Sequence, residues 1–396
     1  LIFVGSFRED LFRIRIYEHV YAYKAVKQDF IASDNLIVLM HKFTGMVNLV
    51  IGIMIEKNLT SRNSVSREVY QKLKEYNMPS YYYPEAINKA VALVKTYRKR
   101  LKKKQKATIP HVYRPMLATY YGFRISNGNL MIPIAARTYE SIPLNAYTRK
   151  VISAVKVHSF ALSAYTLSLT IGREVDSVEC TTTAGIDRNL RNATVGNEFH
   201  HDIHDLSEVV EIKQRYRSKK SHFHRSDKRI QKKIASKYGK RERNRTGQII
   251  HETSKKIVMN ALQRREMIVL ENVKGLINIT KKGDGRGNNY RFLLHNAFPY
   301  GMLASQIVYK GSWEGLPVIE LTGKETRYTS KECSACGSLT RIEHDRMLKC
   351  DSCGLEIDRD INACINIAGR GRTRLKRSSK GLPAEAVKQS KDVEHL

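Results

Sequence analysis

Two pairs of cysteines in the last quarter of the chain constrain its fold more than any other feature. Cys333 and Cys336 form the first pair, Cys350 and Cys353 form the second, and a glycine directly follows each pair. Four thiolates at this spacing close a tetrahedral site of the kind that zinc prefers, and the glycines let backbone amides turn toward the sulfurs. We therefore expect a zinc ribbon over residues 329–354. Structural zinc would hold it folded, because so short a segment has little apolar mass of its own.

The charge balance of the chain indicates a polyanionic partner. Its 396 residues include 69 Lys and Arg against 38 Asp and Glu, which gives a formal net charge of +31. A compact fold with this charge repels itself unless an anion neutralises it, and nucleic acid is the partner we favour. Membrane surfaces and acidic proteins are the alternatives. The apolar content of 42% excludes general disorder and is enough for at least two hydrophobic cores.

Two segments concentrate the positive charge. The first lies at residues 95–106, close to three consecutive tyrosines at residues 81–83, and the second lies at residues 213–245. A charge run is usually a solvated face, but cations beside aromatic groups can hold phosphates while the rings stack on bases. We predict helices in both segments, with nucleic-acid contacts from Lys95, Arg98, Lys99, Arg100, Lys102, Lys103, Arg215, Arg217, Lys219, Lys220, Lys232, Lys233, Arg241 and Arg243.

Residues 36–55 form the longest apolar stretch and have about the length of a membrane span. However, Lys42 lies within it, and its apolar residues recur at the spacing of one helix face. We interpret it as a buried helix of a soluble domain rather than a membrane span, with Ser33 or Asp34 as the N-cap. A second helix is predicted from about residue 84 to residue 104.

The sequence on either side of these helices predicts β-structure. Between residues 109 and 180, β-branched and aromatic residues alternate or cluster between turns rich in glycine, asparagine and proline. Asn127 and Gly128 have the composition of a tight hairpin turn. We therefore expect one β-rich domain made of residues 1–30 and 109–180, interrupted by a helical insert at residues 31–108.

Isolated carboxylates follow apolar strands at two later positions. Asp187 follows Ala-Gly-Ile, Glu271 follows Met-Ile-Val-Leu, and a third acid, Asp358 or Asp360, comes just after the second cysteine pair. Acids from separate segments can surround two magnesium ions, so that one ion activates water and the other stabilises the departing oxygen. A surface carboxylate at a strand end is the alternative for each acid taken alone. Together the acids predict a metal-dependent nuclease.

Other candidate ligands are expected to be structural. His200, His201 and His204 lie close together in sequence, but no partner motif accompanies them, so we expect a polar strand or turn there rather than a metal site. Cys180 and Cys364 lack paired spacing. We expect them as small buried hydrophobes and not as a disulfide.

The order of these residues resembles TnpB, the transposon-encoded relative of type V CRISPR effectors. The matching motifs are Gly-Ile-Asp187, Leu-Glu271-Asn-Val-Lys-Gly-Leu, Trp313-Glu-Gly-Leu-Pro-Val, the two cysteine pairs and Asp358-Arg-Asp360-Ile-Asn-Ala. They span residues 181–370 and are specific in combination, whereas the N-terminal half is similar in layout only.

The resemblance implies an α+β multidomain fold. A β-barrel-like wedge domain would hold a helical recognition insert, and a split RuvC domain with an RNase H-like α/β fold would follow and contain the inserted zinc ribbon. A basic tail would either extend the nucleic-acid surface or be disordered. The implied boundaries are 1–30 and 109–180 for the wedge, 31–108 for the recognition domain, 181–328 and 355–370 for RuvC with its basic helices at 213–245, 329–354 for the ribbon and 371–396 for the tail.

The resemblance also implies an activity, namely RNA-guided cleavage of double-stranded DNA beside a short target-adjacent motif by two-metal hydrolysis. Carried over residue by residue, Asp187, Glu271 and Asp360 are the catalytic acids that hold magnesium. Asp360 is preferred to Asp358 because it occupies the Asp-x-Asn-Ala match. The structural metal is zinc, held by the four paired cysteines.

The partners implied are a transposon-derived guide RNA and a double-stranded DNA target, with no membrane partner. The protein would be cytoplasmic, associated with the prokaryotic nucleoid, and monomeric on one RNA. Two other functions stay open: a guide-dependent DNA-binding regulator that does not cleave, and an RNase H-fold transposase that transfers strands. The intact acids favour cleavage over the first of these.

Overall fold

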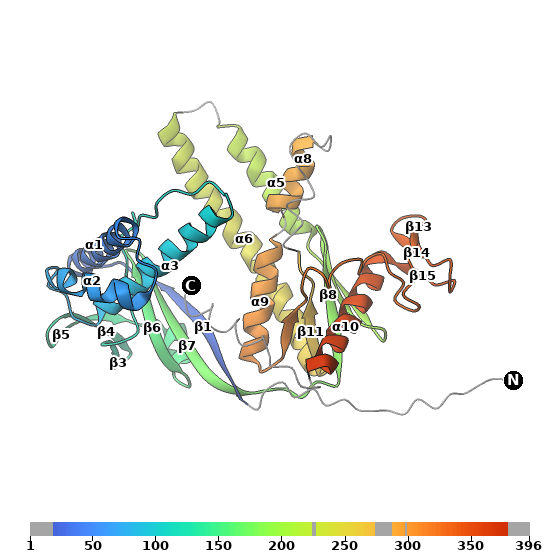
Figure 1. Cartoon of the computed structure of the whole chain (residues 1–396), viewed down its shortest axis with the longest axis horizontal. Coiled ribbons are helices and arrows are strands. Elements are labelled where there is room, and N and C mark those ends of the chain that lie inside the picture. The colour runs from blue at the N-terminus through green and yellow to red at the C-terminus, as the bar shows by residue number, and fades with distance from the viewer. Residues whose placement is uncertain (1–18, 224–226, 274–286, 298, 379–396) are drawn as a thin grey trace. The chain divides into compact units, whose positions relative to one another are not determined.

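A computed structural model describes residues 19–223, 227–273, 287–297 and 299–378 of the chain (Figure 1). These residues divide into two compact units. We call residues 23–173 the N-terminal unit, and residues 174–378 with residues 19–22 the C-terminal unit.

Two small sheets provide the β-structure of the N-terminal unit. One has the strand order β1-β7-β6-β2, and the other is the antiparallel sheet β3-β4-β5. Asn127 and Gly128 join β3 to β4, and both have the positive φ that a two-residue hairpin turn of type I′ requires. The elements are β1 (His19–Asp29), β2 (Leu117–Thr119), β3 (Arg124–Ser126), β4 (Asn129–Ala135), β5 (Thr138–Pro143), α4 (Ala146–Ile152), β6 (Lys156–Ser163) and β7 (Thr166–Asp176).

Three helices lie in sequence between β1 and β2: α1 (Asp34–Glu56), α2 (Arg62–Lys74) and α3 (Tyr82–Lys102). The side chain of Ser33 caps α1 by accepting a hydrogen bond from the backbone N–H of Leu36. Among the described residues, α1 is the one helix with the length and hydropathy of a membrane span. The core helix of a soluble protein passes the same test, and one side of α1 is fully buried, namely Met40, Phe43, Met46, Val47, Val50 and Met54.

A five-stranded sheet with the order β10-β9-β8-β11-β12 forms the centre of the C-terminal unit. Its first three strands form an antiparallel meander, and β11 runs parallel to both β8 and β12. Every residue of β11 is buried, as in parallel strands that are covered on both faces. The strands are β8 (Thr182–Arg188), β9 (Asn192–Gly196), β10 (His201–Asp205), β11 (Glu266–Leu270) and β12 (Val318–Glu320).

Helix α10 (Arg359–Ser378) packs closely on one face of this sheet, and small residues make that possible. Thr183 and Gly185 point to the same side of β8, and the Thr183 hydroxyl donates a hydrogen bond to the α10 backbone at 3.0 Å. A Cβ at Gly185 would lie 2.1 Å from the carbonyl oxygen of Cys364 in α10. Likewise, a Cβ at Gly371 of α10 would lie 2.3 Å from a methyl group of Val269 in β11.

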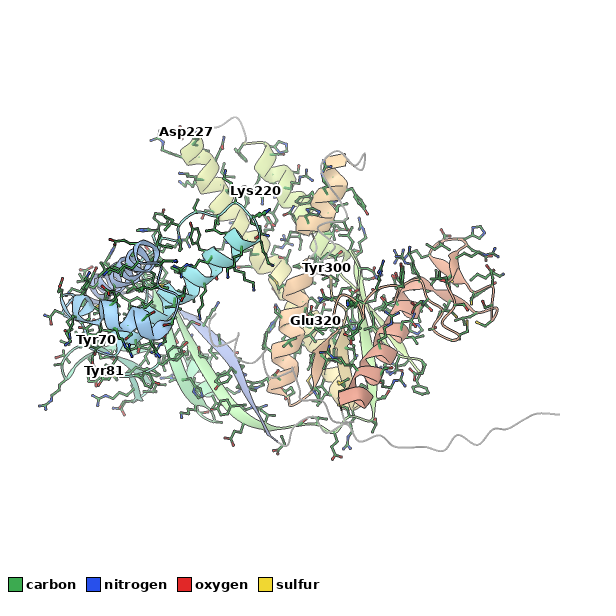
Figure 2. The ribbon with its side chains drawn as sticks, viewed as in Figure 1. Tyr70, Tyr81, Lys220, Asp227, Tyr300 and Glu320 are labelled. Atoms are coloured by element: carbon green, nitrogen blue, oxygen red, sulfur yellow. The ribbon has the colours of Figure 1, made fainter. Side chains whose placement is uncertain are left out.

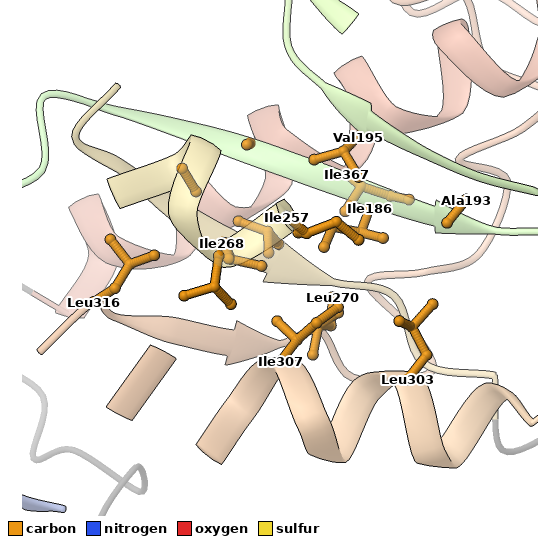
Figure 3. Packing of buried hydrophobic residues seen from close by; sticks show 14 of the residues in the cluster. Ile186, Ala193, Val195, Ile257, Ile268, Leu270, Leu303, Ile307, Leu316 and Ile367 are labelled. Atoms are coloured by element: carbon orange, nitrogen blue, oxygen red, sulfur yellow. The ribbon is translucent and has the colours of Figure 1, made fainter. Parts of the chain in front are cut away.

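Helices α6 (Lys228–Gln263) and α9 (Tyr300–Trp313) share one hydrophobic core with the strands (Figure 3). Ile257 of α6 and Leu303 and Ile307 of α9 belong to this core together with Ile268 and Leu270 of β11. The sequence predicted basic helices over residues 213–245. The second of them does not end there, because one helix of 36 residues continues to Gln263 with no proline to interrupt it. Helix α5 (Ser207–Ser221) pairs with it.

The remaining elements follow α6 in sequence. They are α8 (Gly287–Phe292), the π-helix η1 (Leu293–Ala297), and the small antiparallel sheet of β13 (Arg341–Ile342), β14 (Met347–Lys349) and β15 (Glu356–Asp358). Helix α10 runs through the expected beginning of the basic tail. Within this continued part of α10, the guanidinium of Arg372 binds the carboxylate of Glu198 through two contacts of 2.6 and 2.7 Å. Residues 379–396 of the tail lie outside the described residues.

Candidate carboxylate and cysteine metal centres

Three acids meet at the carboxyl ends of the parallel strands in the C-terminal unit. Ile186 of β8 pairs with Leu270 of β11, so Asp187 and Glu271 occupy the next position on adjacent strands. Asp360 lies in the first turn of α10, the helix that packs on this part of the sheet. All three are buried, with exposed fractions of 9%, 8% and 6% respectively. Segments that lie far apart in sequence thus bring their carboxylates to one place.

The three carboxylates influence one another electrostatically. Burial raises the pKa of Asp187 well above its ordinary value, and the neighbouring Glu271 and Asp360 carboxylates raise it further. Burial also raises the pKa of Glu271, although the adjacent Arg188 guanidinium opposes that rise. A buried group of like charges binds protons unless cations neutralise it, so this site favours the binding of cations.

Asp358 and Asp360 have different environments. The Asp358 carboxylate accepts hydrogen bonds from the backbone N–H groups of Asp360 and Ile361, at 2.8 and 3.1 Å, and so caps the N-terminus of α10. The Asp360 side chain is buried near the other two acids and forms an ion pair with Arg346, which lies just before β14. The acid that joins the carboxylate cluster is therefore Asp360.

Sequence reasoning missed two charged residues at this end of the sheet. Arg188 is buried, and its backbone N–H donates a hydrogen bond to the Glu271 carboxylate at 2.9 Å. Glu320 ends β12 and pairs with Leu270 in the strand register (Figure 2), and its carboxylate opposes the lowering of the Arg188 pKa by burial. An apolar run that ends in an acid could have indicated Glu320, as it did Glu271. An arginine at a strand end is usually exposed, so no pattern pointed to Arg188.

The acid cluster suits hard cations such as magnesium, which take carboxylate oxygens as ligands. Within the part of the chain that is described, the four cysteines form a compact group of candidate metal ligands, and the three acids do not. Carboxylates from separate segments can also be shared between two ions, which in two-metal sites lie roughly 3.5 to 4 Å apart.

The four paired cysteines form a compact group. Their sulfurs all lie within 4.8 Å of one another, with 3.6 Å between Cys333 and Cys353 and 3.4 Å between Cys336 and Cys350. Sulfurs about 2.3 Å from a tetrahedral zinc would be roughly 3.8 Å apart, so the spacing fits this metal. Gly337 and Gly354 have positive φ and complete the two turns. Each donates its N–H to the carbonyl of the first cysteine of its pair, at 2.9 Å.

The predicted nucleic-acid contacts of the N-terminal unit lie on α3. Arg98 is already engaged there, because its guanidinium donates to the backbone carbonyls of Leu59 at 2.6 Å and Met54 at 3.0 Å and so holds the end of α1. Tyr82 and Tyr83 were wrong as candidates for base stacking, since both are core residues that are at most 5% exposed. The other predicted cations are exposed, namely Lys95, Lys99, Arg100, Lys102 and Lys103.

The predicted contacts of the C-terminal unit lie on α5 and α6. Glu242 of α6 binds Lys220 at 2.8 Å and Lys213 at 3.3 Å, which joins the two helices. Arg217 stacks on the ring of Phe292 at 4.2 Å. The other predicted cations of α5 and α6 are exposed, namely Arg215, Lys219, Lys232, Lys233, Arg241 and Arg243.

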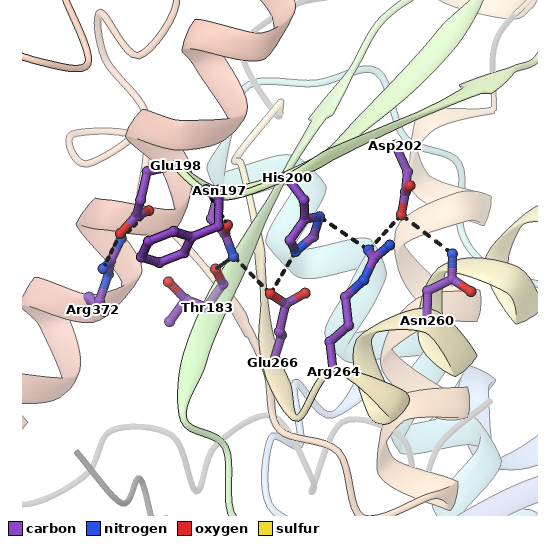
Figure 4. A network of polar contacts seen from close by, with 10 residues as sticks. Thr183, Asn197, Glu198, His200, Asp202, Asn260, Arg264, Glu266 and Arg372 are labelled. Carbon is purple, nitrogen blue, oxygen red and sulfur yellow. Dashed lines mark hydrogen bonds and ion pairs between the residues drawn. The ribbon is translucent and has the colours of Figure 1, made fainter. Parts of the chain in front are cut away.

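The three histidines do not form a metal group in the described parts of the chain. His201 and His204 lie on β10, whose side chains are exposed or half-buried, in agreement with the polar strand that was expected. His200 instead contacts the buried Glu266 at 2.7 Å in a polar network that links β9, β11 and the end of α6 (Figure 4). Asn197 donates to the same carboxylate at 2.8 Å, and Arg264 joins His200 to Asp202. This network lies at the first residue of β11, whereas the acid cluster lies beyond the last one.

Comparison with known proteins identifies similar domains and folds. The family described as "Cas12f1-like, TNB domain" matches residues 300–367, which contain the four cysteines and Asp360. The TnpB-like protein MJ0751 of Methanocaldococcus jannaschii is 32% identical over 164 residues, which is 38% of this chain and 56% of the relative. The CRISPR-associated endodeoxyribonuclease Cas12f1 of Sulfoacidibacillus thermotolerans is 38% identical over 81 residues, 20% of this chain and 18% of that protein.

The match to the first relative spans little more than half of that relative's length. A solved structure extends the similarity at the level of fold. It is a cryo-EM structure of a Cas12f1-sgRNA-target DNA complex, with a TM-score of 0.57 and 14% sequence identity. The alignment covers 85% of this chain and 83% of that one.

Proposed function

This chain is a member of the TnpB and type V effector family, and we propose on that premise that it is an RNA-guided DNA endonuclease. It would cleave DNA complementary to a bound guide RNA, beside a short target-adjacent motif. One observation carries the proposal: three separate segments bring Asp187, Glu271 and Asp360, all buried, to one end of the sheet. A protein that only bound nucleic acid would gain nothing from a buried cluster of like charges, which costs stability.

We assign the chemistry to these acids. Asp187, Glu271 and Asp360 would hold two magnesium ions. Bound there, magnesium supplies an activated water and stabilises the oxygen that departs from phosphorus. The chain's own contribution is to fix the acids on rigid elements and to keep them out of bulk water, which strengthens their interaction with cations. The four cysteines would hold one structural zinc that keeps the ribbon folded.

We assign the partners by charge. The exposed cations of α3 would hold a transposon-derived guide RNA, and those of α5 and α6 would follow the guide–target duplex. The double-stranded DNA target then adds further phosphates that offset the net charge of +31. We expect one chain on one RNA, acting in the cytoplasm at the nucleoid.

We also retain the domain assignment as part of the proposal. The β-structure of the N-terminal unit corresponds to the wedge domain, and α1 to α3 correspond to the helical recognition domain. The C-terminal sheet with α6, α9 and α10 corresponds to the RuvC domain, and residues 329–354 correspond to the target-nucleic-acid-binding zinc ribbon.

The test begins with the RNA that copurifies with the protein. That RNA is sequenced, its guide portion is replaced by a new sequence, and the complex is incubated with plasmids that carry the new target or the old one. The proposal predicts magnesium-dependent cleavage of the new target alone. Binding without cleavage would indicate a guide-dependent regulator, and joining of strands would indicate a transposase. RNA guidance would be refuted if both plasmids were cleaved, or if the complex neither bound nor cleaved either plasmid.

A further inference from the structure

Arg188 occupies an unusual position in the acid cluster. It follows Asp187 directly in sequence, and its side chain is only 1% exposed. The guanidinium donates one hydrogen bond to the backbone carbonyl of Tyr300 at 3.1 Å and another to the backbone carbonyl of Glu271. Its Nε lies 3.6 Å from Oε1 of Glu271. One buried cation thus contacts the ends of β11 and α9 from the end of β8.

The same residue holds the Glu271 side chain through its backbone. The N–H of Arg188 donates to Oε1 of Glu271 at 2.9 Å, so this oxygen receives a hydrogen bond from the main chain and faces the guanidinium nearby. A glutamate has three side-chain torsions, and without partners it would populate several rotamers. With Oε1 held in this way, the carboxylate is fixed in one orientation and the other oxygen is left for a ligand.

The chain also links Arg188 to the first acid. Asp187 and Arg188 are consecutive residues of β8, so any contact that fixes Arg188 against Glu271 also fixes the distance between the Asp187 and Glu271 backbones. The guanidinium further supplies the positive charge that two neighbouring buried carboxylates need when no metal is present.

We infer that Arg188 is a positioning residue that presents Glu271 to the metal ions in a single orientation. This inference rests on the proposed function, because it assumes that Glu271 is a metal ligand. A role limited to tying β8, β11 and α9 together is the alternative. The two differ in what a lysine does at this position, since lysine keeps the charge but lacks the planar fork that reaches several acceptors at once.

The experiment compares Arg188→Lys with wild type and with Arg191→Lys, a control of the same chemistry at an exposed position three residues further on. Manganese binding is measured by calorimetry on the purified protein without DNA, together with zinc content and the melting temperature. We expect Arg188→Lys to weaken manganese binding by about tenfold or more, the usual effect of removing a residue that orients a ligand. Zinc content stays at the wild-type level, and Arg191→Lys behaves as wild type.

Glu271→Gln separates the possible outcomes. If Arg188 acts through Glu271, then Arg188→Lys changes manganese affinity little in a Glu271→Gln background. If Arg188→Lys binds manganese with wild-type affinity while Glu271→Gln binds it more weakly, the inference is overturned but the proposed function is left intact. If Glu271→Gln binds manganese with wild-type affinity, Glu271 is not a metal ligand, and both proposals fail.

Arg188→Gln covers the case in which the lysine variant does not fold. Glutamine keeps a donor for the Glu271 carbonyl without the charge, so we expect a cooperative melt and weakened manganese binding. If both Arg188 variants lose the cooperative melt while Glu271→Gln keeps it, the role of Arg188 is structural and the inference is wrong.

Discussion

The carboxylate of Asp358 accepts a hydrogen bond from the backbone N–H of Asp360, so one acid of this pair holds the helix on which the other is presented. The division of roles follows from position. Asp358 is the last residue of β15 and lies just before α10, where an N-cap is needed. Asp360 is two residues later, as the second residue of α10, and is buried. The two acids should therefore respond differently to substitution.

Asp360→Asn is expected to abolish magnesium-dependent cleavage, because the amide cannot replace a charged ligand. Asp358→Ala should retain activity and lower stability by about 1 kcal/mol, the usual cost of losing an N-cap. Asp358→Ser is the matched control, since serine also caps helices and should restore the stability. Cleavage rates and thermal unfolding of the three variants give the answer, and the opposite ranking of Asp358 and Asp360 would show that the wrong acid was chosen.

Asp187→Asn is expected to stabilise the protein in magnesium-free buffer, in a way that depends on pH. The pKa of Asp187 in the folded protein lies above its unfolded value, so the folded state keeps a proton that the unfolded state releases as pH rises. Wild type therefore loses stability from about pH 4 upward, until the folded pKa is passed, and each unit of that interval costs about 1.4 kcal/mol.

Asparagine removes this loss because it carries no charge at any pH. Calorimetry should show a higher melting temperature for Asp187→Asn than for wild type at pH 8, and a smaller difference at pH 5. Magnesium should raise the melting temperature of wild type at pH 8 and have little effect on the variant. Equal melting temperatures at both pH values would mean that Asp187 is not held among like charges.

Cys350→Ser is expected to lower bound zinc from about one per chain toward zero and to destabilise the ribbon. Structural zinc supplies roughly 10 kcal/mol or more of apparent binding free energy, and Cys350 is the most buried of the four paired cysteines, at 1% exposed. Metal analysis by mass spectrometry checks the first effect, and limited proteolysis of residues 329–354 checks the second. Cys180→Ala is the control, since that buried cysteine lies outside the group. Unchanged zinc in Cys350→Ser would refute the ribbon assignment.

Neutralising exposed cations is expected to separate the two nucleic-acid surfaces. Changing Lys99 and Arg100 of α3 and Lys103 at its C-cap to Gln should reduce the RNA recovered with the protein. The same change at Lys232 and Lys233 of α6 should spare RNA but weaken target capture. Both losses should grow with salt, because each phosphate contact releases counterions. Measuring bound RNA and target binding at two salt concentrations tests this, and variants that retain both at high salt would show that these cations only solvate the surface.

Local patterns in the sequence predicted much of this structure. The apolar spacing of residues 36–55 and the cap at Ser33 predicted α1, and the spacing of the two cysteine pairs predicted the cysteine group. Both signals depend on residues that are close in sequence. The acids at strand ends could be named, but their convergence depends on strand order and on close packing at Gly185, which a single sequence does not reveal.

What could not be predicted was mostly side-chain environment. Tyr82 and Tyr83 were expected beside the basic run, yet tertiary packing buries them, and Arg98 serves the end of α1. Arg188 gave no signal, because a buried arginine is recognisable only from partners that the fold brings from far away in sequence. The full length of α6 was not predicted, because its first part is highly charged and its last part is apolar, so the two parts of this one helix look like two separate elements in the sequence.

The central claim is that Asp187, Glu271 and Asp360 form one metal-dependent cleavage site. The most direct measurement is a plasmid cleavage assay on wild type, Asp187→Asn, Glu271→Gln and Asp360→Asn, each carrying its copurified RNA. The plasmid contains the complementary target, and magnesium is varied in 10-fold dilutions. Glu68→Gln is the control, since Glu68 is a half-buried acid of the N-terminal unit that pairs with Lys57 and lies outside the acid cluster. We predict that all five proteins bind the target and that only wild type and Glu68→Gln cleave it. Full cleavage by any of the three acid variants would contradict the account.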